Sequence, residues 1–528
     1  MRKLLVFLLC FSVLVLQAAA PAGRIREVHL DGAMDGTLTL DMTFSRNVSA
    51  VQLEVMDAQR RRILYRSGLK PQKGKLHFSE KSAYPVEPWS AETPATYSLK
   101  VSAFTPQGLK EIRVYPFAFR KVEWRRNRLL LNGRGVRIKG LRQTALLPEG
   151  TVTDGDLLQA IRSLKQLNIN AVSADYRPGD ASWATLCDRF GLYVVPAELL
   201  DSCTVLPERE LRYRYRDIWS AGMPWALEVS NGCSFRSLSD VCLYWSLEAD
   251  GVPLRSGLVE QLFAAPQETE TLDLGITPQQ LEALPGTLTL TLRYELKRPW
   301  SLLEAGTEIA CEQLLLRDER PVLMDCEGPA VTLADSPERC TFSGAGWSLA
   351  FDKRSGGLIS YQSVQREWLA EPLLPDLPEP ALLRFNVLPL EQGYWVEAVY
   401  SSGRVGYQLA PDGSLSGVAD GTLRMALPAS CDRLDFLGLG PWENLPGSCD
   451  AALLGRYHQP VSGSGPHTGL RVFSVLDASG NGIRLVSPLD FTAEARAYTP
   501  DGRLLTDVRF SAAEDTEFRF VLTAVKKD

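Results

Sequence analysis

The sequence predicts a mainly β, multi-domain protein in which β-sandwiches flank a short α/β unit. Three observations along the chain predict this fold class. Apolar and polar residues alternate in short runs up to about residue 120, a strand-and-helix pattern follows up to about residue 220, and the alternation then returns and persists. Alternation with a period of two is typical of half-buried strands, whereas apolar residues three and four positions apart are typical of amphipathic helices.

The β-rich segments on either side of the α/β unit are expected to form three separate domains. Residues 23–120 and 221–318 each predict an immunoglobulin-like β-sandwich, because short alternating runs are separated by turn residues. Residues 319–528 predict a larger C-terminal β-sandwich. Two of its hairpins are expected at the turn pairs Asp412-Gly413 and Asp501-Gly502.

The α/β unit, residues 121–220, is expected to pair its strands in parallel, because strands and helices alternate along it. Residues 153–156 have the composition of a helix start, and apolar residues at helical spacing follow them. The expected elements are strands at 136–141, 171–172 and 192–195, a helix beginning near residue 154, and helices at 183–190 and 207–219.

Size and charge limit the functions open to this chain. Its 528 residues, of which 45% are hydrophobic and 23% are charged, correspond to roughly three to five globular domains. The formal net charge is −6, from 57 basic and 63 acidic residues. Because there is no basic excess, nucleic acid and anionic membrane surfaces are excluded as partners.

The N-terminus has the order of features that is typical of a secretory signal peptide. Two basic residues precede an apolar run at residues 4–16, which is too short to span a bilayer, and small residues follow. Because Ala20 and Ala22 form a small-x-small pair, we expect residues 1–22 to be cleaved as a leader. The mature protein is then expected in the periplasm or outside the cell, without a membrane span.

The cysteines and histidines predict neither a disulfide framework nor a metal centre. Nine cysteines follow the leader, and an odd number spread over a large chain does not indicate a framework. An oxidising compartment would still permit pairs such as Cys326 with Cys340 or Cys431 with Cys449. Neither CxxC nor HExxH occurs among the residues, so we predict no metal and no cofactor.

Several segments resemble β-galactosidases of glycoside hydrolase family 2, in the same order along the chain. They lie late in the first sandwich, at the first three barrel strands and in the last domain, at residues 89–94, 129–140, 164–172, 186–195 and 438–444. The last of these is similar to the family pattern G-x-G-P-x-E-N. The resemblance implies that the α/β unit is a truncated (β/α) barrel remnant and that the C-terminal domain is like the family's small chain.

The resemblance also implies that both catalytic glutamates are absent. Retaining glycosidases use two carboxyl groups about 5–5.5 Å apart, and in this family both come from later barrel strands. Here the chain passes from Val195 through a short connection to residues 210–215, which resemble the helix that closes the barrel. The family's N-terminal sugar-binding domain is missing too, and its other active-site positions align with Arg142, Gln143, Thr144, Ser173, Tyr176, Asp201, Cys203 and Ser487.

Two acidic residues near the end of the third expected strand are candidates for a replacement catalytic pair. Glu198 and Asp201 lie at the carboxyl end of that strand, where barrel enzymes place their chemistry. The alternative is a solvated acidic loop, since two acids in one loop are common and pairs with perturbed pKa values are not. Asp201 also aligns with a magnesium ligand of the family, but one carboxylate cannot build a magnesium site.

Trp442 and Glu443 are candidates for substrate binding. An aromatic face beside a hydroxyl acceptor suits a sugar, and a galactoside-containing glycan is the ligand that the resemblance implies. The alternative is that Trp442 only packs against a turn shaped by the neighbouring glycines and proline. A third acid, Asp188, is expected in a helix-surface ion pair with Arg162 or Arg189.

Three classes of function follow. The first is an exported, catalytically inactive glycan-binding or scaffold protein of carbohydrate metabolism, the second an active glycoside hydrolase with relocated carboxylates, and the third a structural or assembly module. Three parallel strands leave two open edges, so the remnant needs cover. We expect the helix at 207–219 and the flanking sandwiches to cover it within a monomer, as a spacer between domains.

Overall fold

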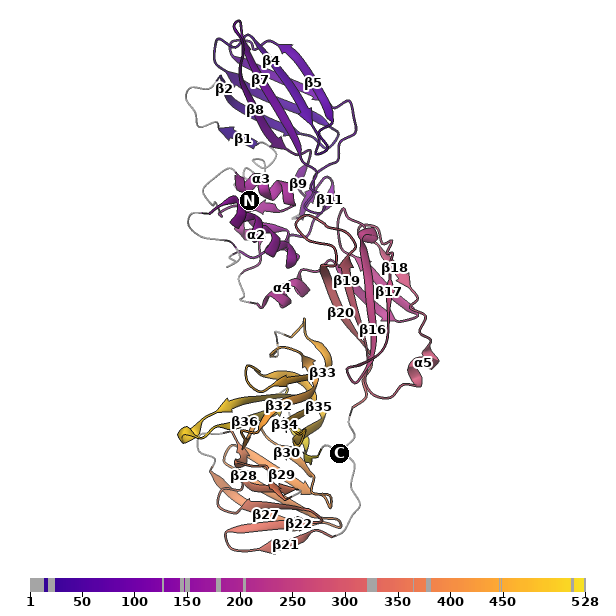
Figure 1. The fold of residues 1–528 in the computed structure, drawn as a ribbon, viewed down its shortest axis with the longest axis vertical. Helices are drawn as coiled ribbons and strands as arrows, with labels where there is room; N and C mark the ends of the chain where they lie inside the picture. The colour runs from indigo at the N-terminus through magenta and orange to yellow at the C-terminus, as the bar shows by residue number, and fades with distance from the viewer. Residues whose placement is uncertain are drawn as a thin grey trace.

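The computed structural model describes residues 14–17, 24–125, 128–142, 147, 152–176, 182–202, 206–320, 330–363, 365–376, 381–445, 447, 449–513 and 517–526. Its modules follow one another along an elongated molecule, with the N-terminal sandwich (indigo) at one end and the C-terminal sheet (orange to yellow) at the other (Figure 1). The predicted fold class is confirmed, because the chain is mainly β and its few helices are short.

The first sandwich consists of two antiparallel four-stranded sheets, in the orders β1-β2-β3-β6 and β5-β4-β7-β8. In β3 every second side chain is buried, as the alternation predicts. β1 falls within the predicted leader, and the other residues of 1–22 lie outside the described part. The strands are β1 (Leu14–Gln17), β2 (Ile25–Gly32), β3 (Thr37–Phe44), β4 (Ala50–Met56), β5 (Arg62–Leu69), β6 (Lys75–Lys81), β7 (Tyr97–Thr105) and β8 (Gly108–Phe117).

The α/β unit begins with a small antiparallel sheet and continues with helices around two short parallel strands, β12 and β13. Helix α2 starts where the sequence predicts, because Thr153 and Asp156 form a reciprocal capping box. The elements are β9 (Val122–Arg125), β10 (Arg128–Leu131), β11 (Arg134–Gly135), α2 (Asp154–Gln166), β12 (Ala171–Ser173), α3 (Ser182–Phe190), β13 (Tyr193–Val195), the 3-10 turn η1 (Ala197–Leu199) and α4 (Glu208–Arg214).

Two expectations about this unit are wrong. The segment 136–141 is not a strand; Leu141 makes an isolated parallel bridge with Asp201, and the Lys139 carbonyl accepts from the amides of Asn170 and Ala171. The expected helix at 207–219 ends at Arg214, because the residues after it join the next sandwich. Ladder hydrogen bonds to β15 fix Ile218–Met223 as strand β14, and they outweigh local helix propensity.

The second sandwich packs a three-stranded sheet, β14-β15-β18, against a four-stranded sheet, β17-β16-β19-β20. Central strand β19 is buried along almost its whole length, as expected for a strand with neighbours on both sides. The elements are β14 (Ile218–Met223), β15 (Ala226–Asn231), η2 (Leu238–Asp240), β16 (Val241–Ala249), β17 (Val252–Val259), β18 (Thr269–Leu272), α5 (Pro278–Glu282), β19 (Leu288–Leu296) and β20 (Glu308–Arg317).

The C-terminal region is one curled sheet of 17 strands, rather than the two separate sheets of a sandwich. It curls because strands far apart in its order also pair, for example β26 with β31 and β30 with β37. Both predicted hairpins connect paired strands, β29 with β30 and β35 with β36.

Strands β21 to β28 form the first part of this sheet: β21 (Thr332–Asp335), β22 (Arg339–Gly344), β23 (Trp347–Asp352), β24 (Leu358–Ser363), β25 (Arg366–Glu367), β26 (Glu371–Pro375), β27 (Leu382–Pro389) and β28 (Tyr394–Tyr400). The second part consists of β29 (Gly403–Leu409), β30 (Leu415–Ala419), β31 (Leu423–Pro428), β32 (Cys431–Gly440), β33 (Leu453–Pro460), β34 (His467–Asp477), β35 (Gly482–Tyr498), η3 (Pro500–Gly502), β36 (Leu505–Ala512) and β37 (Phe518–Val525). Large apolar side chains fill the core, each contributing about 1.5–3 kcal/mol on burial.

Within the described residues the cysteines are free thiols, including Cys340, Cys431 and Cys449, whereas Cys326 lies outside that part of the chain. The pair of Cys431 with Cys449 is therefore not formed in this structure. None of the described helices has the length and apolar character needed to cross a membrane.

Candidate functional site

Asp201 is bound into the framework of the barrel remnant. Its carboxylate accepts a hydrogen bond from the Tyr215 hydroxyl at 2.7 Å and lies 3.5 Å from the Arg214 guanidinium. Its backbone is bonded on both sides, since its amide donates to Gly140 and its carbonyl accepts from Arg142. Burial, and next the hydrogen bond to Asp201, raise the pKa of Tyr215, so the phenol stays protonated as the donor.

Glu198 lies in a different setting. It is an exposed residue of the 3-10 turn η1, and within the described part of the chain no hydrogen bond or ion pair joins it to Asp201. The two acids therefore share a loop without forming a coupled pair. A retaining mechanism needs one carboxyl group as acid and a second as nucleophile facing the same sugar.

The turn that carries Trp442 and Glu443 lies against helix α4. The Arg209 guanidinium lies 4.8 Å from the centre of the Trp442 ring, and an Nη2 hydrogen of Arg209 is donated to the Glu443 carbonyl at 3.0 Å. Asn444 is buried and fixes the turn from inside, by donating to the carbonyls of Leu439 and Trp442. Trp442 is thus half-buried with a cation on its ring, while the Glu443 side chain is exposed.

The ion pair of Asp188 differs from the expectation. Its partner is Arg120, at the exit of the first sandwich, with oxygen–nitrogen distances of 2.6 and 3.3 Å, rather than Arg162 or Arg189. The Asp188 carbonyl also accepts from the Trp89 indole at 2.7 Å. Helix α3 is therefore bonded to the first sandwich by both its side chain and its backbone.

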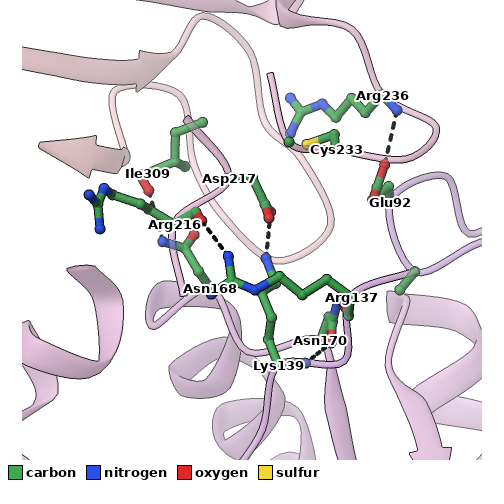
Figure 2. Close-up of polar contacts among 12 residues, drawn as sticks. Glu92, Arg137, Lys139, Asn168, Asn170, Arg216, Asp217, Cys233, Arg236 and Ile309 are labelled. Atoms are coloured by element: carbon green, nitrogen blue, oxygen red, sulfur yellow. Dashed lines mark hydrogen bonds and ion pairs between the residues drawn. The ribbon is translucent and has the colours of Figure 1, made fainter. Parts of the chain in front are cut away.

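A junction of three modules surrounds a cavity of ≈ 50 Å³, which is lined by residues from the first sandwich, the barrel remnant and the second sandwich. Glu92 of the first sandwich crosses this junction. Its carboxylate accepts from the backbone amides of Ser234, Phe235 and Arg236 at 2.9, 2.6 and 3.0 Å. Figure 2 shows the contact with Arg236. A carboxylate that accepts several backbone amides is well compensated for its loss of water.

The barrel remnant is bonded to the second sandwich in the same region. The buried Lys139 ammonium forms an ion pair with Asp217, and Asn168 donates to the Ile309 carbonyl at 2.8 Å (Figure 2). Arg137 donates to the carbonyl of Arg216 at 3.3 Å. These contacts join residues that are about 80 to 140 positions apart in the chain. They fix the second sandwich against the barrel remnant.

Two cations at the cavity have no carboxylate partner among the described residues. Lys165 is only 3% exposed, and its ammonium donates to the carbonyls of Gly191 and Ala91. Burial, and next the charge of Lys139, lower the pKa of Lys165 to about 7. Arg236 has a buried Nη2 atom that finds no hydrogen-bond partner in the described part of the chain.

Both unpaired cations lie over one aromatic ring. The Lys165 nitrogen is 5.2 Å and the Arg236 guanidinium carbon 4.5 Å from the Trp300 ring centre. The thiol of Cys233 also lines the cavity, and burial raises its pKa well above the usual value, so it is neutral. The described residues include no group of three or more His, Cys, Asp or Glu side chains placed to hold a metal ion.

The sequence contains one signal for this junction, although the contacts between its modules are not visible in it. Lys165 lies four positions after Ile161, on the face of α2 that carries its apolar residues, so the helical periodicity indicates that Lys165 is buried. The periodicity does not indicate the residues around it, because Ala91 and Arg236 come from other domains. Gly191 marks a second contact, since its φ is +75° and a Cβ atom there would lie 2.3 Å from the Ala91 carbonyl oxygen.

Three family descriptions match successive parts of the chain. "Glycosyl hydrolases family 2, TIM barrel domain" matches residues 122–214, "Beta-galactosidase, domain 4" matches 227–317, and "Beta galactosidase small chain" matches 389–502. The matches occur in the order of the remnant, the second sandwich and the curled sheet. Three successive modules of the chain are therefore similar to parts of family 2 glycoside hydrolases.

Individual proteins match over shorter lengths. A β-galactosidase of Vibrio vulnificus is 40% identical over 109 residues, which cover 20% of this chain and 11% of that protein. A β-galactosidase of Yersinia enterocolitica is 35% identical over 140 residues, covering 26% of this chain and 13% of that protein. The chain is a relative of the family 2 β-galactosidases that carries a partial TIM barrel domain.

The matched segments thus span little more than a tenth of the length of these relatives. Among solved structures, a β-glucuronidase of Faecalibacterium prausnitzii aligns with a TM-score of 0.28 and 21% identity, over 34% of this chain and 29% of that one. A similarity at this level says nothing about activity.

Proposed function

We propose that this chain is an exported, non-hydrolytic relative of the β-galactosidases, in which the barrel remnant is a structural hub that holds the β-modules in place. The observation that supports the proposal is that the Asp201 carboxylate bonds to the framework of the barrel remnant. Its carboxylate is engaged by Tyr215 and Arg214, and it has no coupled partner in Glu198. Among the described residues of this strand end the side chains therefore serve the framework, and no pair of carboxyl groups is placed there for acid and nucleophilic catalysis.

The scaffold form of this proposal is favoured over the glycan-binding form. A sugar platform needs an aromatic face open to the ligand, whereas the Trp442 ring has the Arg209 guanidinium 4.8 Å from its centre. The end of the connection that contains this turn is bonded to the barrel remnant, because Glu210 accepts from the Ala451 amide. The start of the following strand is bonded to the second sandwich, because Gln313 exchanges two hydrogen bonds with Leu454. The turn works as an interface in this arrangement.

The test of the hydrolytic part is turnover of an activated aryl β-galactoside by the purified chain. We expect no turnover above background, and no change in E198A or D201A. Hydrolysis that is lost in either variant, while the variant keeps its thermal unfolding transition, would contradict the proposal and support relocated carboxylates. Binding is tested separately by calorimetric titration with lactose. The scaffold form predicts no binding heat, whereas a binding heat that is lost in W442A would support the glycan-binding form.

The export part is tested by cell fractionation and N-terminal sequencing of the mature protein. Cleavage after Ala22 gives a chain that begins at Gly23 in the periplasm or medium. A cytoplasmic chain that retains residues 1–22 would contradict the proposed export. It would not affect the proposal that the barrel remnant is a structural hub, which is tested separately.

A further inference from the structure

The three-module junction contains more positive than negative charge once its internal pairs are counted. Of the five ionised side chains that line the cavity, Lys139 is paired with Asp217, and Glu92 is satisfied by three backbone amides. Lys165 and Arg236 remain. Both line the same cavity, and neither has a carboxylate within ion-pair distance in the part of the chain that the structure describes.

The groups that contact Lys165 and Arg236 compensate their positive charges only in part. Lys165 donates to two backbone carbonyls, and the Trp300 ring attracts both cations through its π-face. An N–H of a charged group that is buried without an acceptor costs more than a neutral one. The unpartnered Nη2 atom of Arg236 therefore points to an acceptor that the protein itself does not supply.

The size of the cavity limits the acceptor. It offers ≈ 50 Å³ to the centres of water-sized molecules, which is room for a few waters or one small ion. A water would satisfy the hydrogen bond but would leave the excess positive charge uncompensated, since three cations and two carboxylates line the cavity. A monatomic anion of similar size satisfies the hydrogen bonds and the charges together.

We propose that this cavity binds one small monovalent anion, chloride, between Lys165 and Arg236. The anion joins the barrel remnant, which supplies Lys165, to the second sandwich, which supplies Arg236, beside the Glu92 contact from the first sandwich. It is thus a structural ligand of the module junction. The inference is independent of the proposed lack of hydrolysis, because it concerns a cavity separate from Asp201 and Glu198.

The first experiment compares the thermal unfolding of the full chain in potassium chloride and in potassium gluconate at equal ionic strength, since gluconate is a far larger anion than chloride. We expect chloride to raise Tm saturably, by about 1–3 °C. The variants R236M and K165M keep most of the apolar volume of their side chains and are expected to lose this increment. R255M, at an exposed arginine of the same module that donates to the Gly275 carbonyl, is the matched control and should keep it.

The second experiment does not depend on the folding of a variant. Crystals of the unmodified chain grown in bromide are expected to show an anomalous peak inside the cavity, within hydrogen-bond distance of the Lys165 and Arg236 nitrogens. A chloride increment that R236M and K165M retain would overturn the proposal. Bromide-grown crystals that contain only a water in the cavity would overturn it as well.

Discussion

The Arg209 guanidinium lies 4.8 Å from the centre of the Trp442 ring, across the boundary between helix α4 and the C-terminal curled sheet. The same arginine donates to the Glu443 carbonyl, so it binds both residues that the sequence marks as a sugar platform. A long basic side chain covers apolar surface along its stem while its charged head meets the aromatic face. The segment similar to G-x-G-P-x-E-N is therefore part of an interface between modules in this chain.

The contact predicts that Arg209 and Trp442 stabilise the chain as a pair. R209A removes a cation–π contact and a hydrogen bond, so we expect the free energy of unfolding to fall by about 1–2 kcal/mol in urea titrations followed by tryptophan fluorescence. In a double-mutant cycle with W442A the coupling should be about 1 kcal/mol. R354A, at an exposed arginine in the same C-terminal region, should change the unfolding free energy by less than about 0.5 kcal/mol. Additive effects of R209A and W442A would contradict the pairing.

Glu92 gives a direct test of the junction as a hub. In E92Q an amide NH₂ group replaces one carboxylate oxygen and faces backbone amides that need an acceptor. We expect a loss of about 2–3 kcal/mol and faster limited proteolysis near residues 232–237, since charge-assisted bonds to amides are the stronger kind. E304Q is the control, because Glu304 is 72% exposed and its carboxylate lies 3.5 Å from Arg162. Equal proteolysis of E92Q and E304Q would argue against the hub.

The order of the modules was accessible from the sequence because it depends on local periodicity. The alternation in β3 and the apolar stripe of α2 both appear where they were expected. The end of α4 was not accessible, because residues 215–217 contain no glycine or proline to stop a helix, and the pairing of β14 with β15 decides it. The curled closure of the C-terminal sheet likewise depends on pairings between strands far apart in the chain.

The candidate site was less accessible for the same reason. Glu198 and Asp201 are neighbours in sequence, yet the role of Asp201 is set by Tyr215 and by a backbone bridge to Leu141. The partner of Asp188 is in another module rather than one helical turn away. Residue spacing predicts contacts within one helix or strand. The junction instead joins residues far apart in the chain, such as Ala91 and Lys165, which lie 74 positions apart.

Buried His467 predicts a loss of stability in acid. Gln459 donates to its Nε2 at 2.8 Å, and burial lowers the pKa of the imidazole from 6.5 to about 4. Between pH 6.5 and 4 the unfolded chain therefore binds one proton more than the folded chain, and stability falls as the pH falls. The slope from this group reaches at most about 1.4 kcal/mol per pH unit. H467Q should show a shallower decline over this interval, whereas H77Q, at an exposed histidine, should follow the unmodified chain.

Lys165 predicts a dependence of the same sign at alkaline pH. Burial, and next the charge of Lys139, lower its pKa from 10.5 to about 7. Below pH 7 both folded and unfolded chains hold the proton, so the full cost of burying the charge is present. Between pH 7 and 10.5 the unfolded chain keeps a proton that the folded chain releases, and stability rises with pH.

The measurement is the difference in unfolding free energy between the unmodified chain and K165M, because thiols and other groups that titrate in the same interval cancel in it. From pH 7 to 9, in gluconate buffer, we expect this difference to move in favour of the unmodified chain by more than about 1 kcal/mol, since one proton contributes about 1.4 kcal/mol per pH unit. With chloride the change should be smaller, because an anion beside the ammonium stabilises its charged form and raises its pKa. A difference that stays constant across this interval would show that the lysine keeps its proton in the folded chain.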